Sequence, residues 1–158
     1  MDVRVDTKRM QQIWEIEMSN HILAATLLAA GLFSAAASAE TLNFKATLNG
    51  ASEVPATTSK GTGDTLATLD TATKMLSYTV TYQGLTGPAA AGHIHGPAAA
   101  GANAGVAIPF ASAATPIRGT ATLTDAQIAD LKAGMMYVNI HTADNKGGEI
   151  RGQLMMSK

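Results

Sequence analysis

The chain has 158 residues, with 11 Lys and Arg against 12 Asp and Glu and a formal net charge of −1 at pH 7. Because the charges nearly cancel and no basic cluster occurs along the chain, the sequence excludes the electrostatic footprint of a nucleic-acid-binding protein. The chain contains no cysteine, so an exported form has no disulfides and depends on its core or on a metal for stability.

The first 39 residues are expected to be a leader with a signal peptide. Residues 22–39 form an apolar, alanine-rich run ending in Ala-Ser-Ala, the small-x-small pattern that signal peptidase cleaves. We expect cleavage before Glu40, a periplasmic or secreted location, and no membrane segment afterwards. A retained anchor is the alternative, but the run is only marginally long enough to cross a bilayer. Residues 1–17 are acidic where signal peptides carry positive charge, so Met18 is an alternative start.

Residues 40–158 have the usual size of one domain, and their composition favours short strands and tight turns. In residues 42–48 apolar side chains alternate with polar ones, the period of a half-buried strand, and Asn49-Gly50 predicts the turn that ends it. Residues 62–70 and 74–83 predict an antiparallel hairpin. Its second strand has four apolar side chains on a single face, namely Leu76, Tyr78, Val80 and Tyr82.

The middle of the chain continues this pattern of strands and loops. Residues 89–95 predict a strand, and the small, flexible residues 98–105 predict a loop. Residues 106–110 predict a short edge strand, because Pro109 has no N–H to donate to a neighbouring strand. Residues 117–123 alternate between apolar and polar side chains and predict a further strand.

The last part of the chain predicts one helix and a final hairpin. Residues 124–127 have the Thr-Asp-Ala-Gln pattern of a capping box, and Gly134 is a stop signal, which together predict a helix of about two turns. Residues 135–142 and 148–155 predict a hairpin around a turn at residues 143–147. With about eight strands and one short helix, the sequence predicts an all-β antiparallel sandwich or barrel.

Every histidine outside the leader lies in one of two predicted strands. Side chains two apart on a strand point to the same face, so His93 and His95 project together. In the second strand Asn139 and His141 share the polar face. If the two strands are neighbours, three imidazoles converge on one place.

Several phrases taken together resemble the CHRD domain family, a module repeated in chordin and found singly in many bacterial exported proteins. The phrases are FKATLNGASEVP, YTVTYQGLTG, AGHIHGP, MMYVNIHT and GGEIRGQL, and they extend from Leu42 to Leu154. The resemblance implies an extracytoplasmic β-rich domain, which in chordin-like animal proteins belongs to secreted antagonists of growth factors. The chain departs from the pattern at Gly92, where Ala is common, and at Pro109. The family's characteristic positions are occupied here by Glu53, His93, His95, His141, Glu149 and Arg151.

The two histidine strands are also similar in pattern to copper/zinc superoxide dismutase, an eight-stranded Greek-key sandwich. This resemblance implies a Greek-key architecture. The dismutase has more metal-binding histidines than this chain, so a dinuclear site is not expected.

Three neutral imidazoles on adjacent strands form a nitrogen-rich site that suits Cu(II) or Zn(II) and leaves positions for water. We therefore expect a mononuclear metal site at His93, His95 and His141. Copper is favoured, with zinc second. Iron and magnesium fit less well because the site lacks an obvious carboxylate cage.

Three further residues are candidates to support these ligands: Glu149, Arg151 and Asn139. Glu149 is the first of them, because a ligating imidazole usually donates its other N–H to a carboxylate or a carbonyl. The plainer expectation for Glu149 and Arg151, which are two apart on one strand, is a surface or inter-strand ion pair. Glu53 is expected to be a turn-stabilising acceptor in a loop rather than a ligand.

The sequence supports three functions. The first is an exported binding protein with a copper-type site. The second is an extracellular or envelope module that binds another protein, in which His93 and His95 are hydrogen-bonded to the glycine-rich loop and His141 caps its strand. The third is a small copper-dependent oxidoreductase. It comes last, and an enzyme is less expected than a binding protein, because no general acid, base or substrate pocket is identifiable from the sequence.

Overall fold

The computed structural model describes residues 39–157. The predicted signal peptide and the alternative start at Met18 lie outside these residues and stay predictions. Among the residues described, no helix is both long enough and apolar enough to cross a membrane.

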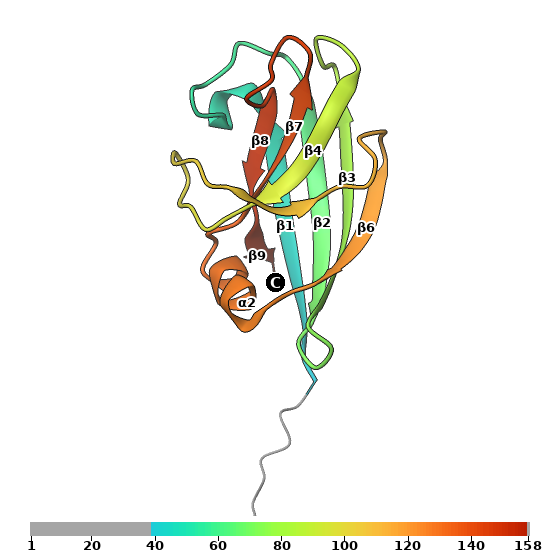
Figure 1. Ribbon diagram of the computed structural model, residues 1–158, viewed down its shortest axis with the longest axis vertical. Helices are drawn as coiled ribbons and strands as arrows, with labels where there is room; N and C mark the ends of the chain where they lie inside the picture. The colour runs from blue at the N-terminus through green and yellow to red at the C-terminus, as the bar shows by residue number, and fades with distance from the viewer. Residues whose placement is uncertain (1–38, 158) are drawn as a thin grey trace, which may run out of the picture. The chain divides into compact units, whose positions relative to one another are not determined.

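The described chain forms nine strands, one α-helix and one turn of 3₁₀ helix (Figure 1). In chain order these elements are β1 (Thr41–Asn49), η1 (Gly50–Ser52), β2 (Thr62–Asp70), β3 (Met75–Gln83), β4 (Ala89–His95), β5 (Val106–Pro109), β6 (Ile117–Thr122), α2 (Asp125–Lys132), β7 (Tyr137–Thr142), β8 (Ile150–Gln153) and β9 (Met155–Ser157).

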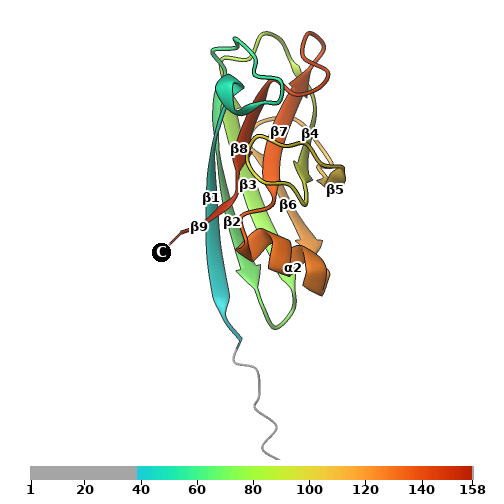
Figure 2. The same cartoon turned by 90° about the vertical axis from the view of Figure 1, so that its left-hand side faces the viewer.

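The strands form one antiparallel sheet that curls into a nearly closed barrel. Its order is β5-β4-β7-β8-β1-β2-β3-β6, and β9 pairs with β1 beside this path. The chain crosses from β3 to β4, and β6 then returns to pair with β3 while β7 pairs with β4, which is a Greek-key arrangement. Figure 2 shows β4 and β7 on one side and β1 and β2 on the other. The prediction of an all-β antiparallel barrel with one helix is confirmed.

Alternation along the strands builds the core as predicted. In β1 the apolar residues at every second position are buried, and Leu48 is 0% exposed. In β3 the predicted face is buried at Leu76, Tyr78 and Val80 and half-buried at Tyr82. Each large apolar side chain removed from water contributes about 1.5–3 kcal/mol, so the packed interior supplies most of the barrel's stability.

Helix α2 begins with the predicted capping box. The Thr124 hydroxyl accepts a hydrogen bond from the Gln127 backbone N–H at 3.2 Å, and the Gln127 side chain accepts one from the Thr124 backbone N–H at 2.9 Å. Leu131 is buried on the barrel side of the helix, and Gly134 has a φ of +69° just past its end. The capping box at Thr124 and the glycine at position 134 therefore set the two ends of α2, which lies between β6 and β7 in the chain.

Strand β5 is an edge strand, as Pro109 predicts, since β5 pairs only with β4 among the described strands. The chain's departure at Gly92 also has a physical reason. A Cβ added there would lie 2.8 Å from the Phe110 ring and 2.9 Å from Ile140 Cδ1. Glycine therefore allows β4 to pack closely against its neighbours.

Candidate metal centre

The histidine cluster, His93, His95 and His141, forms where β4 pairs with β7. In this antiparallel pair His141 lies opposite Ala91, and His93 lies opposite Asn139. Each histidine offers one ring nitrogen, and these three atoms all lie within 4.8 Å of one another. The closest pair is His93 Nδ1 and His141 Nε2, at 3.1 Å. The prediction that three imidazoles converge on neighbouring strands is confirmed.

Backbone carbonyls orient two of the rings. His95 Nδ1 lies 3.0 Å from the Ala104 carbonyl oxygen, and His141 Nδ1 lies 2.9 Å from the Lys146 carbonyl oxygen. Because a carbonyl only accepts, the proton of each neutral ring resides on Nδ1 and Nε2 keeps its lone pair. Metal-binding histidines are typically oriented in this way. The Nε2 atom of His95 is buried and has no hydrogen-bond partner, so it is free to bind a ligand.

The environment of His93 and His141 favours their neutral form. Burial lowers the pKa of His93, and repulsion from His141 and His95 lowers it further. Burial also lowers the pKa of His141; its hydrogen bond to Lys146 acts in the opposite direction, and His95 lowers it again. Neutral imidazole is the form that coordinates metals, so at neutral pH these two rings are in their binding form.

The donor set and its spacing fit a single transition-metal ion. Two nitrogens bound to one Zn or Cu ion at bonds of about 2.0–2.1 Å are at most about 4.2 Å apart, which is about 0.6 Å less than the 4.8 Å within which the three ring nitrogens lie. Binding of one ion by all three rings therefore requires the outermost ring nitrogens to move closer by at most about this amount. His95 is 8% exposed while His93 and His141 are half-buried, which leaves a side that water can reach.

Tyr137, which the sequence reasoning missed, supports His95 and the loop above it. The two rings stack with centroids 4.9 Å apart and an interplanar angle of 5°. The Arg151 guanidinium carbon lies 3.4 Å from the Tyr137 ring centroid, and this side chain donates to the Ala102 carbonyl and to Asn103 Oδ1. The alternation of β7 could have identified Tyr137, because it places Tyr137 on the same face as Asn139.

The three supporting candidates do not hydrogen-bond to the ligands. Within residues 39–157, His93 and His141 hydrogen-bond to each other, and the other hydrogen bonds of the histidine rings are those of His95 and His141 to the two backbone carbonyls. Arg151 acts through Tyr137 instead. Asn139 is 3% exposed and lies across the strand pair from His93, and its Oδ1 has no partner.

Glu149 is held in a separate set of side chains, the Glu149 cluster. Its carboxylate accepts five hydrogen bonds of 2.6–3.2 Å, one of them from a backbone N–H. The donors belong to Ser59, Thr86, Thr142 and Asn145. Burial alone would raise the pKa of Glu149, but the hydrogen bonds from Ser59, Thr142 and Thr86 outweigh it and lower the pKa to about 2. This carboxylate is therefore ionised and fully satisfied.

The predicted Glu149–Arg151 ion pair is wrong. Both side chains are buried, at 0% and 1% exposure, and in the described part of the chain the one salt bridge joins Lys74 and Asp125. The physical reason is that loops cover this face of the sheet. They supply hydroxyl donors to Glu149 and carbonyl acceptors to Arg151, so neither side chain needs the other.

Glu53 also differs from its prediction as a turn acceptor. Its side chain is 6% exposed, and its Oε1 is buried without a hydrogen-bond partner. Burial raises the pKa of Glu53 to about 7, although the positive charge of Arg151 and a hydrogen bond from the Val54 backbone lower it. The carboxyl therefore lies in an environment that does not fully stabilise its charge.

Comparison with known proteins adds one match. The family model of the CHRD domain matches residues 44–154, a range that includes the whole histidine cluster. No curated protein and no solved structure matches the chain.

Proposed function

The chain belongs to the CHRD domain family, and we propose that this member binds one divalent metal ion through His93, His95 and His141. Three imidazole nitrogens without a carboxylate favour Cu(II), with Zn(II) second. The chemistry that such an ion supplies is strong binding of nitrogen ligands with positions left for water. The residues of this chain bind the ion and exclude part of the solvent.

One observation carries the proposal. Three ring nitrogens lie within 4.8 Å of one another, and two of the rings have Nδ1 at a carbonyl so that Nε2 faces the cluster with a lone pair. The buried and unpartnered Nε2 of His95 is the strongest part of this observation. A buried polar atom without a partner costs free energy, and a metal ion at this point removes that cost.

Isothermal titration of the metal-free full chain with Cu(II) tests the proposal. We expect one ion per chain, and a loss of affinity of more than about tenfold in His93→Ala and in His141→Ala. The control is Lys60→Ala, at an exposed residue outside the cluster, which should leave the affinity unchanged. Binding weaker than about micromolar, or equal binding in all variants, would reject the site.

A second function has its own supporting observation. The hydrogen bonds of His95 to Ala104 and of His141 to Lys146 are also what a purely structural role requires. In this alternative the protein is a module that binds an extracellular or envelope protein without metal. A triple His→Ala variant would then lose thermal stability in the metal-free state and would bind envelope fractions more weakly, independently of added copper.

The proposal includes export of the mature protein to the periplasm or the medium. Its support is the leader sequence, with an apolar run that ends in a small-x-small pattern before Glu40. N-terminal sequencing of the secreted form should begin at Glu40. A mature chain that retains Trp14 would contradict this part of the proposal.

A further inference from the structure

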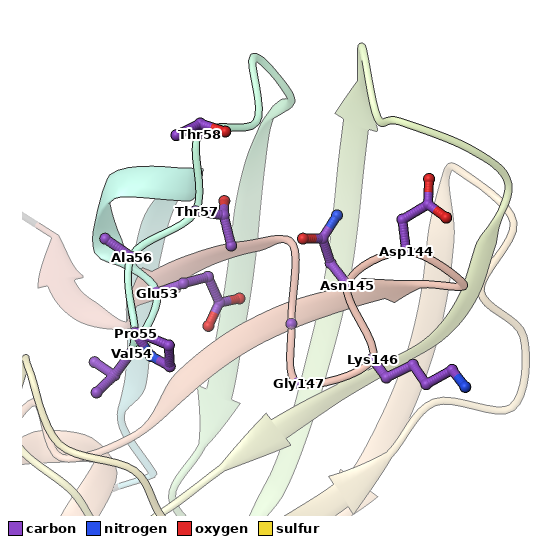
Figure 3. A pocket seen from close by; sticks show the side chains of 11 residues that line it. Glu53, Val54, Pro55, Ala56, Thr57, Thr58, Asp144, Asn145, Lys146 and Gly147 are labelled. Atoms are coloured by element: carbon purple, nitrogen blue, oxygen red, sulfur yellow. The ribbon is translucent and has the colours of Figure 1, made fainter.

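A pocket separate from the histidine cluster lies between two loops. It has a volume of about 450 Å³, and its walls are residues 53–58, after η1, and residues 144–148, which form the turn between β7 and β8. Figure 3 shows the Glu53 carboxyl pointing from one wall toward the turn that carries Gly147. The volume is in the range of small-molecule sites.

Glu53 is the unusual group of this pocket. Glu53 is only 6% exposed, yet its Oε1 has no hydrogen-bond partner. Buried carboxyl oxygens normally accept hydrogen bonds, as both oxygens of Glu149 do. An acceptor that is left without a donor at the wall of a pocket indicates a ligand that brings the donor.

Gly148 keeps the space next to this carboxyl free. A Cβ added to Gly148 would collide with Glu53 Oε1 and would lie 2.7 Å from Glu53 Cδ. Gly148 also has a φ of +132°, a conformation that residues with side chains rarely adopt. Glycine at position 148 therefore allows the backbone to adopt this turn and leaves room for the Glu53 carboxyl beside it.

We propose that this pocket binds a primary ammonium group, with Glu53 Oε1 as its buried acceptor. An ammonium has three N–H donors and no acceptor, which matches an acceptor without a donor. Asp144 lines the same pocket and adds a second carboxylate, while Lys146 is the single cationic residue among the lining. A hydroxyl ligand would supply the donor but would gain nothing from the two acidic groups.

The pocket and the histidine cluster share one turn. Lys146 lines the pocket, and its carbonyl accepts the hydrogen bond that orients His141. The ammonium proposal does not depend on the metal, because Glu53 is not part of the histidine cluster. Metal-free protein is therefore used for the test, so that failure of one proposal is distinguishable from failure of the other.

NMR titration of the ¹⁵N-labelled full chain tests the pocket with matched small probes. The first probe is n-butylammonium; 1-butanol has the same chain without charge, and tetramethylammonium has charge without N–H donors. We expect n-butylammonium to shift the amide signals of Thr57, Thr58, Gly147 and Gly148 at millimolar concentration, and the other two probes to have at least about tenfold weaker effects. Equal effects of all three probes, no shifts at all, or tighter binding of Ca²⁺ would overturn the proposal.

Two substitutions locate the binding. Glu53→Gln keeps the shape of the side chain, and we expect it to fold with an unchanged circular dichroism spectrum and to weaken n-butylammonium binding about tenfold. Glu40→Gln is the matched control at an exposed glutamate and should have no effect. Unchanged binding in Glu53→Gln would show that the probe does not use this carboxyl and would overturn the proposal.

The ammonium group can come from a free amine or from a lysine side chain of a protein partner. N-acetyl-lysine methylamide is the probe that distinguishes them. Tighter binding of this probe than of n-butylammonium supports a protein lysine as the ligand. Tighter binding of n-butylammonium supports a free amine.

Discussion

The histidine cluster and the Glu149 cluster both consist of polar side chains beneath loops, but they differ in whether their hydrogen-bonding atoms have partners. Both oxygens of Glu149 accept hydrogen bonds from hydroxyl, amide and backbone donors. In the histidine cluster the Nε2 atom of His95 has no hydrogen-bond partner, and His93 Nδ1 lies 3.1 Å from His141 Nε2. Burial of polar groups is common to both. The buried ring nitrogen of His95 without a hydrogen-bond partner is what makes the histidine cluster a candidate binding site.

Removal of Glu149 should have the largest effect on stability. Glu149→Ala leaves the buried hydroxyl of Thr142 and the hydroxyl of Thr86, an exposed residue, without their acceptor, and we expect a loss of about 3–5 kcal/mol in the free energy of unfolding. Urea denaturation measures it. Glu40→Ala, at an exposed glutamate, is the control and should cost less than about 0.5 kcal/mol. A similar small change in both variants would contradict the structural role of the Glu149 cluster.

The pH dependence of stability should separate Glu149 from Glu53. Glu149 has a pKa of about 2 in the folded protein, below its ordinary 4.5. Its ionisation therefore adds to the free energy of unfolding above pH 4.5, and this stabilisation is lost as the pH falls toward 2. Glu53 has a pKa of about 7 in the folded protein, above its ordinary 4.5. Its contribution to the free energy of unfolding is therefore fully present below pH 4.5 and is lost as the pH rises toward 7. Each change is about 3 kcal/mol at most.

The histidines titrate in the same range as Glu53, so the test compares the wild type with Glu53→Gln by urea unfolding at several pH values. The difference in stability between the two proteins should change between pH 4.5 and 7 and be constant below that range. A constant difference across the whole range would show that the carboxyl of Glu53 is not perturbed by burial.

Substitution of Arg151 should have an intermediate effect, because Arg151 lies over the ring of Tyr137, which stacks on the ring of His95. Arg151→Lys keeps the charge but removes the planar group over Tyr137 and one of its two loop hydrogen bonds. We expect a loss of about 1–2 kcal/mol in stability and a several-fold weaker Cu(II) affinity, through the ring of His95. Stability measured by urea and affinity measured by titration check the two parts. Unchanged copper affinity would show that the stacking of Arg151, Tyr137 and His95 does not affect metal binding.

The exposed ion pair gives the smallest expected effect. Lys74 Nζ lies 2.7 Å from Asp125 Oδ1, but the two side chains are 42% and 83% exposed. We expect Asp125→Asn to change the free energy of unfolding by less than about 0.5 kcal/mol, since solvent screens such pairs. Thermal melting measures this change. An effect as large as that of Glu149→Ala would mean that burial is not what separates these charged groups.

The sequence predicted the strands and the meeting of the histidines because both follow from alternation. The period of two in β4 and β7 places His93, His95 and His141 on one face, and the antiparallel pairing then brings them together. The capping box of α2 depends on residues close in sequence and was equally readable.

The partners of the buried charges were not predictable in the same way. Glu149 accepts hydrogen bonds from Ser59 and Thr86, which are 90 and 63 residues away in the chain. Arg151 bonds to a loop 49 residues away. No local pattern encodes contacts of this kind, because they depend on which loops cover the sheet. The ion pair inferred from the spacing of Glu149 and Arg151 failed for this reason.

Pulsed EPR of the Cu(II)-loaded full chain tests the difference between the two clusters most directly, because it counts the imidazoles bound to the ion through their remote ring nitrogens. A site made by the histidine cluster predicts three coupled imidazoles in the wild type and two in His95→Ala. The same count in both proteins, or no coupled imidazole in the wild type, would contradict the assignment of the unpartnered His95 nitrogen as a metal ligand.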